Sequence, residues 1–210
     1  MSRLGHCNDG RVGADLGTWD PLLPAEAAAE LVGLPCRWWL AGGWAIDLYL
    51  GHQRRPHADL DVLILRAEQS AVQRHLAGWD LHAADPPGTL RPWAGGEILG
   101  PRVHDVWCRR SASSPWSLQL MIDDTLDDHW VYRRDSRIRR PLADLYGPAS
   151  TPERPVLSPE IQLLYKSARP RDKDEADFHA VVEALCAPQR RWLRESLATV
   201  SAGHPWLEQL

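Results

Sequence analysis

Two aspartates separated by a single residue, Asp59 and Asp61, open an apolar run that extends to Leu65. Successive side chains of a β-strand point to opposite faces, so these carboxylates should project together while Leu60 and Val62 pack the other way. Two adjacent carboxylates repel one another unless a cation lies between them. Mg²⁺ prefers hard oxygen ligands, including carboxylates and substrate phosphates. The spacing therefore predicts a magnesium site with Asp59 and Asp61 as ligands.

A pair of glycines, Gly42 and Gly43, follows a short apolar run from Trp38 to Leu40 and precedes a helical segment. Glycine at a strand-to-helix turn lets a phosphate approach the backbone, and a helix N-terminus favours negative charge. Together with the two carboxylates, the pair indicates a metal-nucleotide site. The simpler interpretation, which each half of the pattern alone would favour, is a tight turn followed by acids that solvate the entrance to a strand.

Arg55 and His57 precede Asp59 at the same two-residue spacing, so both side chains are expected beside the carboxylates. A guanidinium group forks onto phosphate oxygens. We therefore predict that Arg55 and His57 contribute to nucleotide binding, although a histidine here is also typical of a local hydrogen-bonding residue. Asp47 is expected to be structural within its short helix.

The ungapped segment from Gly42 to Asp61 contains Gly-Gly-Trp-Ala-Ile-Asp, then Gly51, then Arg-x-His-x-Asp-x-Asp. It resembles the signature of the aminoglycoside 2''-adenylyltransferase group within the nucleotidyltransferase superfamily. The resemblance implies an enzyme that moves a nucleoside monophosphate, AMP in this group, from ATP to a hydroxyl of an aminoglycoside-like acceptor. A weaker resemblance to the helical half of small nucleotidyltransferases continues in Pro159, Glu160, Lys166, Arg171, Lys173, Asp174 and Asp177. It implies that Lys166 reaches the triphosphate.

The resemblance also implies a third carboxylate on a later strand, acting as a metal ligand or a general base. On the predicted strand from Ser117 to Asp123, the matching position falls on Gln119, which cannot serve as a base. Asp123 lies on the same predicted face, and Asp105 lies on a neighbouring predicted strand. We therefore assign the catalytic group to Asp59, Asp61, Asp123 and Gln119, with Asp105 as a further candidate. The missing clear acid leaves open a catalytically impaired relative that binds a nucleotide or a partner.

Composition favours a small substrate over nucleic acid. The 210 residues are 44% hydrophobic, enough for a sizeable core, and the net charge of −4 provides no overall basic field. An acidic run formed by Asp123, Asp124, Asp127 and Asp128 would attract ammonium groups. A small, cationic, hydroxyl-bearing acceptor is predicted. Adenylylation of a protein or a tRNA end is the alternative.

No apolar run approaches the roughly 20 residues that a membrane-spanning helix needs. The segment 1–17 is polar and does not resemble a signal peptide. The cysteines, at positions Cys7, Cys36, Cys108 and Cys186, lie far apart without a Cys-x-x-Cys pair, so reduced thiols and no zinc are expected. These features predict a cytoplasmic protein.

The order of elements predicts an α/β fold, and the resemblance implies a nucleotidyltransferase fold with a mixed central sheet and a C-terminal helical subdomain. Expected strands cover 37–40, 62–65, 80–84, 103–109, 117–123, 130–134 and 138–140. Expected helices cover 24–34, 44–50, 67–76, 159–168, 173–185 and 190–199. The run 147–152 is a predicted linker between an α/β domain, 1–150, and a helical subdomain, 151–210. A proline- and glycine-rich loop, 86–101, is expected near the site, where Trp93 could stack on a base or sugar.

Overall fold

The computed structural model describes residues 16–210. The predictions made for Cys7 and for most of the polar N-terminal segment lie outside this range. The strands of the described chain are β1 (Trp38–Leu40), β2 (Asp61–Leu65), β3 (Asp80–Ala84), β4 (Leu90–Pro92), β5 (Asp105–Arg109), β6 (Leu118–Leu126), β7 (His129–Val131) and β8 (Arg139–Pro141). The α-helices are α1 (Pro24–Glu30), α2 (Gly42–Leu50), α3 (Gln69–His75), α4 (Pro159–Ser167), α5 (Asp172–Val182) and α6 (Ala187–Val200). Short 3₁₀ helices are η1 (Arg66–Glu68), η2 (Leu142–Leu145) and η3 (Pro205–Glu208).

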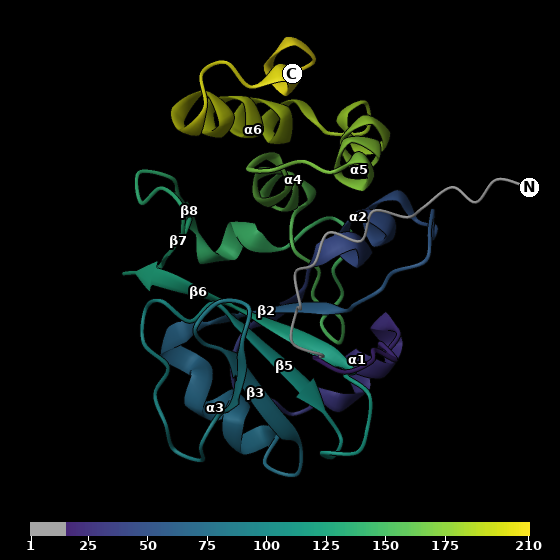
Figure 1. Ribbon diagram of the computed structural model, residues 1–210. Helices are drawn as coiled ribbons and strands as arrows, with labels where there is room; N and C mark the ends of the chain where they lie inside the picture. The colour runs from purple at the N-terminus through teal and green to yellow at the C-terminus, as the bar shows by residue number, and fades with distance from the viewer. Residues whose placement is uncertain (1–15) are drawn as a thin grey trace, which may run out of the picture.

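The strands form one mixed sheet in the order β1-β2-β6-β5-β3-β4, with β7 joined to β6 and β8 joined to β7. Strands β2 and β6 run parallel, and the other paired strands run antiparallel. Helices α4, α5 and α6 stack above the sheet, whereas α1 and α3 lie lower in the view (Figure 1). The α/β class predicted from the sequence is confirmed.

Alternation along the central strands separates an apolar face from a face that carries polar groups. Val62, Ile64, Leu120, Ile122 and Val106 are all fully buried on the first face. These residues come from β2, β6 and β5, where β-branched and leucine side chains suit a pleated, buried surface. Asp61, Gln119 and Asp105 of the same strands lie on the other face, as the two-residue period of a strand requires.

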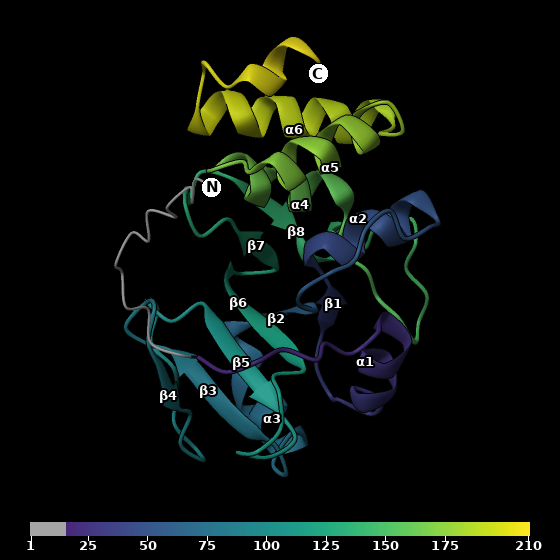
Figure 2. The same ribbon diagram turned by 45° about the vertical axis from the view of Figure 1, so that its right-hand side comes forward.

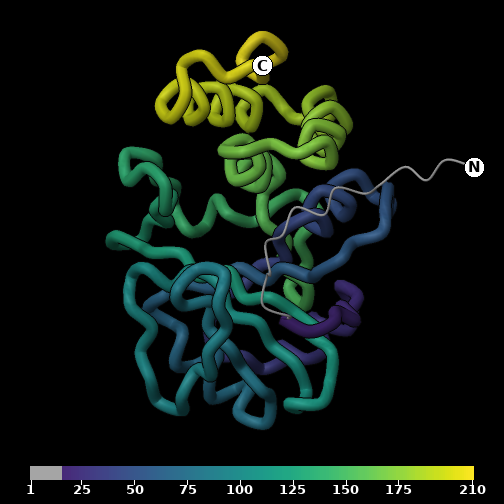
Figure 3. Tube along the Cα trace, viewed as in Figure 1, coloured from purple at the N-terminus to yellow at the C-terminus, as the bar shows by residue number. Residues whose placement is uncertain are grey.

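Helix α2 begins earlier than predicted, at Gly42, and ends where expected. Its C-cap is Gly51, which adopts a left-handed conformation with φ of 78°. Glycine has no Cβ atom to clash in this conformation, and its N–H donates to the carbonyl of Leu48 at 3.2 Å, which ends the helix. Helix α2 packs against α4 and α5, which follow it by more than a hundred residues in the chain (Figure 3). This packing places the glycine pair beside the C-terminal helices.

The C-terminal helices form a layer of their own, with η3 folded over α6 and α5 at the top of the molecule (Figure 2). Phe178 of α5 stacks on Trp206 of η3 with ring centroids 4.2 Å apart and planes 5° apart. The Trp206 indole N–H also donates to Glu175 Oε2 at 2.7 Å. Aromatic stacking and this hydrogen bond fix the end of the chain against α5.

The chain that leads into α4 pairs with the first strand of the sheet. Leu40 donates its N–H to the carbonyl of Pro155 at 2.9 Å, and Leu157 donates to the carbonyl of Leu40 at 2.8 Å. The predicted linker is therefore followed by residues that are part of the sheet edge. The division of the chain near residue 150 stays a prediction.

The segment 86–101 does not form the predicted loop near the site. It contains β4, which pairs antiparallel with β3 at the edge of the sheet farthest from β1. Trp93 is only 5% exposed, and its indole N–H donates to the carbonyl of Glu97 at 2.9 Å. Because Trp93 is a core residue, it cannot stack on a ligand as proposed.

No helix in residues 16–210 is long and apolar enough to cross a bilayer.

Candidate active site

A cavity of about 600 Å³ lies where the sheet meets helices α4 and α5. Its acidic lining residues are Asp59, Asp61, Asp105 and Asp174, and its basic lining residues are Arg55, Arg133, Arg134, Lys166, Arg169, Arg171 and Lys173. Gly42, Gly43 and Gln119 complete much of the rest of the wall. Predicted site residues that are far apart in sequence thus share one cavity.

Strand register brings a third carboxylate to the aspartate pair. Asp61 is the first residue of β2 and lies opposite Gln119 of β6, while Asp105 is the first residue of β5 and lies opposite Met121 of β6. The Gln119 side-chain amide donates to Asp105 Oδ1 at 2.9 Å. Gln119 therefore lies between two acids and orients one of them, which is a role that an amide can fill although it cannot act as a base.

The carboxylates influence one another strongly. Burial and, after it, the charges of Asp59 and Asp105 raise the pKa of Asp61 to about 7, while Lys166 and Lys173 oppose this rise. The side chains of Asp59 and Asp61 accept no hydrogen bond and form no ion pair anywhere in residues 16–210. This is a site of concentrated negative charge, which favours a bound cation.

The glycine pair makes room for protein side chains. Gly42 has φ of +63°, and a Cβ atom there would lie 1.9 Å from Asp61 Oδ2. A Cβ atom on Gly43 would lie 2.4 Å from His57 Nδ1 and 2.8 Å from Arg55 Nη2. The backbone N–H of Gly42 donates to Gln162 Oε1 at 2.8 Å, so it is already bonded within the protein. Of the two glycines, only Gly43 therefore has a backbone N–H that could bond a phosphate, as predicted for this turn.

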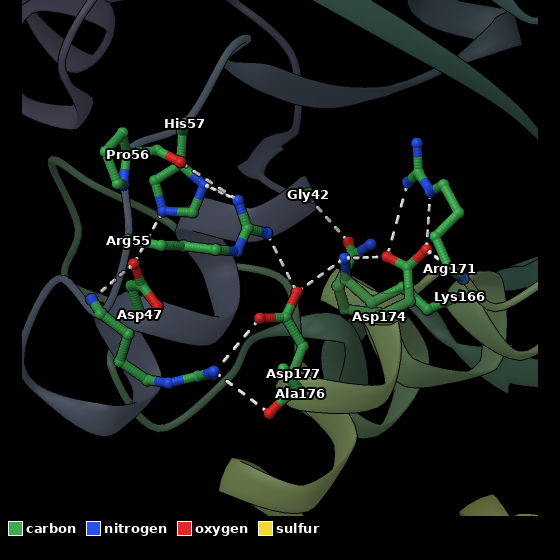
Figure 4. Close-up of polar contacts among 12 residues, drawn as sticks. Gly42, Asp47, Arg55, Pro56, His57, Lys166, Arg171, Asp174, Ala176 and Asp177 are labelled. Carbon is green, nitrogen blue, oxygen red and sulfur yellow. Dashed lines mark hydrogen bonds and ion pairs between the residues drawn. The ribbon is translucent and has the colours of Figure 1, made fainter. Parts of the chain in front are cut away.

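A chain of charged contacts crosses from the loop before β2 to α4 and α5 (Figure 4). Asp177 Oδ2 receives Arg55 Nη2 at 3.0 Å and Lys166 Nζ at 2.9 Å. Lys166 Nζ also lies 2.8 Å from Asp174 Oδ1, and Arg171 Nε lies 2.8 Å from Asp174 Oδ2. Three basic residues of the cavity wall are therefore held by two buried aspartates.

His57 lies behind this wall and does not line the cavity. Its Nε2 is 2.7 Å from Asp47 Oδ2, and its Nδ1 is 3.2 Å from Arg55 Nη1. Because a guanidinium group can only donate, Nδ1 accepts and Nε2–H donates to Asp47. The ring also lies 4.5 Å from that of Trp44. His57 thus supports Arg55, as the local hydrogen-bonding alternative proposed, and Asp47 has the structural place expected of it.

Asp123 is fully buried and does not line the cavity. It receives the indole N–H of Trp130 at 2.6 Å and the hydroxyl of Tyr165, and burial raises its pKa. The structure therefore does not bring Asp123 to the aspartate pair, although its face of the strand was predicted correctly.

The acidic run around Asp123 does not form the expected cation-binding surface. Asp124 Oδ1 is paired with Arg66 Nε at 2.6 Å, and Asp127 lies in the β6–β7 turn with φ of 52°. The four carboxylates thus divide between the core, an ion pair and an exposed turn. Strand alternation and the tight turn explain why neighbours in sequence separate in space.

Lys173 lies one helical turn before Asp177, but Asp177 is bonded to other cations. Lys173 lines the cavity instead and has no hydrogen-bond or ion-pair partner in the described part of the chain. Arg133 lines it too, with its guanidinium 5.3 Å from the ring centroid of Tyr165. Sequence reasoning missed Arg133, because no local motif marks the end of a hairpin as part of a site.

The close approach of Gly42 to Asp61 gives a prediction with a matched control. Gly42→Ala and Gly51→Ala both place a Cβ atom in a left-handed conformation, which costs roughly 1–2 kcal/mol. Only Gly42→Ala pushes Asp61 aside, since a Cβ atom on Gly51 would meet nothing within 4 Å. We expect both variants to unfold at lower urea concentration and only Gly42→Ala to lose magnesium-dependent nucleotide binding. Equal binding by the two variants would contradict this.

The raised pKa of Asp61 predicts a stability that depends on pH. Between the ordinary value of 3.8 and about 7, the folded protein holds this proton and the unfolded chain does not, so stability falls as pH rises through that window. Asp61→Asn should therefore raise the melting temperature of the metal-free protein above pH 7, and the gain should shrink towards pH 4. Glu153→Gln, in an exposed loop, serves as the control. A gain independent of pH would refute the titration of Asp61 as its cause.

Part of the chain matches a known protein family. Residues 25–83 match the family described as aminoglycoside-2''-adenylyltransferase, a segment that contains Gly42, Gly43, Asp59 and Asp61. No match was found among curated proteins.

Several solved structures show a distant similarity to this chain. The lincosamide antibiotic adenylyltransferase LnuA with bound lincomycin is 18% identical, with 74% of this chain and 91% of that chain covered and a TM-score of 0.49. The solution structure of the antibiotic-resistance factor ANT(2'')-Ia is 18% identical, with 85% and 90% covered and a TM-score of 0.49. Its crystal structure with adenylyl-2''-tobramycin is 15% identical, with 82% and 92% covered and a TM-score of 0.49. At these values no residue correspondence follows from them. The resemblance predicted from the sequence is confirmed over residues 25–83, where this chain is similar to the aminoglycoside-2''-adenylyltransferases, a group of nucleotidyltransferase enzymes.

Proposed function

We propose that the protein transfers a nucleoside monophosphate, AMP from ATP, to a hydroxyl group of a small acceptor and releases pyrophosphate. The observation that carries this proposal is the convergence of Asp59, Asp61 and Asp105 on one cavity whose remaining wall is rich in arginine and lysine. Carboxylates suit a magnesium ion, and the basic wall suits the phosphates that the ion accompanies. The match of residues 25–83 supports the same reaction class.

The donor set fits magnesium. In residues 16–210 no three His, Cys, Asp or Glu side chains are arranged as a metal cage by themselves. Magnesium does not need one, because it is commonly held by one or two carboxylates with water and substrate phosphates as further ligands. Asp59 and Asp61 would hold the ion, and their lack of other partners in the described chain leaves their oxygens available. When bound, the ion would neutralise charge that develops on the transferring phosphoryl group.

Other residues of the cavity would bind the triphosphate and accept a proton. The Gly43 amide, near the N-terminus of α2 and without an acceptor inside the helix, is placed to receive a phosphate oxygen. Lys173, Arg171 and Lys166 contribute positive charge for the triphosphate. Asp105 accepts a hydrogen bond from Gln119 and would accept the proton of the attacking hydroxyl. Most of the acceleration would come from this positioning and from charge neutralisation.

The acceptor is proposed to be a small hydroxyl-bearing molecule, in line with the antibiotic acceptors named for the similar structures. The acidic run that was expected to bind its ammonium groups is dispersed in the fold. Of the acidic residues of the cavity, Asp59 and Asp61 are assigned to the metal and Asp105 to the proton of the hydroxyl, while Asp174 is paired with Lys166 and Arg171. The proposal that the acceptor is cationic therefore rests only on the net charge of −4. Adenylylation of a protein or a tRNA end stays the alternative.

The first experiment tests nucleotide binding. Calorimetric titration with ATP is expected to show binding that requires magnesium in the unsubstituted protein and that is lost when Asp59→Asn and Asp61→Asn are combined. The physical reason is that amides supply no negative charge to balance the ion. Magnesium-dependent binding would justify a screen of hydroxyl-bearing acceptors, starting with aminoglycosides, by pyrophosphate release. Absence of binding in the unsubstituted protein would refute the proposal and favour a partner-binding role.

A second experiment decides between the two candidate third acids. Asp105→Asn should lower the rate of pyrophosphate release by on the order of 10²- to 10⁴-fold with nucleotide binding largely kept, as expected when a general base is removed. Asp123→Asn should instead lower the melting temperature, since Asp123 bonds Trp130 and Tyr165 inside the core. A rate that falls in folded Asp123→Asn but not in Asp105→Asn would reverse the assignment.

A further inference from the structure

A single buried carboxylate joins the two parts of the basic wall. Asp177 of α5 is fully buried, and its Oδ2 receives both Arg55 Nη2 at 3.0 Å and Lys166 Nζ at 2.9 Å. Arg55 comes from the loop before β2, whereas Lys166 comes from the end of α4. Both cations line the cavity and Asp177 does not.

We propose that Asp177 is a positioning residue that sets the affinity for the triphosphate by holding Arg55 and Lys166 at the cavity wall. The inference rests on the proposed nucleotidyl transfer. Arg and Lys side chains are long and lose much rotamer freedom when a ligand orders them. With both cations already bonded to one buried oxygen, most of that ordering is complete before the nucleotide arrives.

The surroundings of Asp177 keep it charged. Burial acts to raise its pKa, but the hydrogen bond from Arg55 and the charge and hydrogen bond of Lys166 outweigh burial and hold the pKa below its ordinary value. A buried pair with unfavourable desolvation is weak support for stability but fixes geometry well. The contacts therefore suit alignment of the wall more than strength of the fold.

The neighbouring arginine supplies a matched control. Arg54 also bonds Asp177, with Nη1 3.3 Å from Oδ1, and its Nη2 donates to the carbonyl of Ala176 at 3.1 Å. Arg54 does not line the cavity, whereas Arg55 does. Arg54→Gln and Arg55→Gln thus each remove one cation from the same carboxylate, and only the second removes a cavity cation.

The sign of the effect separates positioning from simple charge. Asp177→Asn removes a negative charge beside three cations, Arg54, Arg55 and Lys166, so Coulomb's law alone would make phosphate bind more tightly. Loss of positioning makes it bind more weakly instead. The oxygen of asparagine is also a poorer acceptor for two cations than a carboxylate, and hydrogen bonds to charged groups are among the stronger ones.

The test measures the affinity of magnesium-loaded ATP and of AMP by calorimetry for Asp177→Asn, Arg55→Gln and Arg54→Gln, with melting temperatures alongside. We expect Asp177→Asn and Arg55→Gln to weaken ATP binding on the order of 10-fold or more, with a much smaller effect on AMP, which lacks the outer phosphates. Arg54→Gln should leave ATP affinity unchanged even if its melting temperature falls.

Three results would overturn the inference: ATP affinity in Asp177→Asn equal to or above that of the unsubstituted protein, equal losses for ATP and AMP, or equal losses in Arg54→Gln and Arg55→Gln. If Asp177→Asn does not fold, Asp177→Glu is measured in its place, because it keeps the negative charge but moves the carboxylate away from its position beside Arg55 and Lys166. It is expected to weaken ATP binding more than AMP binding, and unchanged ATP affinity would overturn the inference. No ATP binding by the unsubstituted protein would instead refute the proposed function, and this inference with it.

Discussion

Mutual repulsion among the carboxylates Asp59, Asp61 and Asp105 is the constraint to which much of the surrounding structure responds. Burial and the other two charges raise the pKa of Asp61 to about 7, so the ionised site is unfavourable without a cation. The fold nevertheless brings the acids together, with Gly42 yielding the space that Asp61 occupies. A group kept at an energetic disadvantage within a stable fold is what a binding site for positive charge requires.

The arginine and lysine side chains of the cavity wall must be held in place before an anion is bound. Free arginines and lysines at a cavity would repel one another and point into solvent. Here two buried aspartates, Asp174 and Asp177, hold Arg171, Lys166 and Arg55 in alternating contact. Asp174 lines the cavity and Asp177 lies behind its wall, and both counter-charges lower the repulsion among the cations. These acids, which bond cations, thus differ in role from Asp59 and Asp61, which have no bonded partner in the described chain.

The sequence pattern predicts that Asp59 and Asp61 lie together, and both line the cavity. The two-residue period of a strand predicts that Asp59 and Asp61 face one way, and a glycine pair before a helix predicts a close approach. The third acid depends on how β5 and β6 pair, and a one-residue change of register would move a side chain to the other face. Sequence alone could therefore name Asp105 and Asp123 as candidates but not choose between them. The packing of α4 against α5 is likewise determined by contacts between segments distant in sequence. It pairs Lys166 with Asp177 and leaves Lys173 without a bonded partner in the described chain.

The cavity does not belong to either half of the predicted division at residue 150. Residues after that point pair with β1 through Leu40, and Gln162 of α4 accepts the backbone N–H of Gly42. Polar contacts of this kind, together with the ion pairs of Asp177, lose much of their strength to desolvation, so an apolar contact of the same size would hold the helices at least as well. Their advantage is directional: they fix where each donor and cation points. The polar character of this junction is thus better explained by the alignment of a shared site than by the stability of the fold.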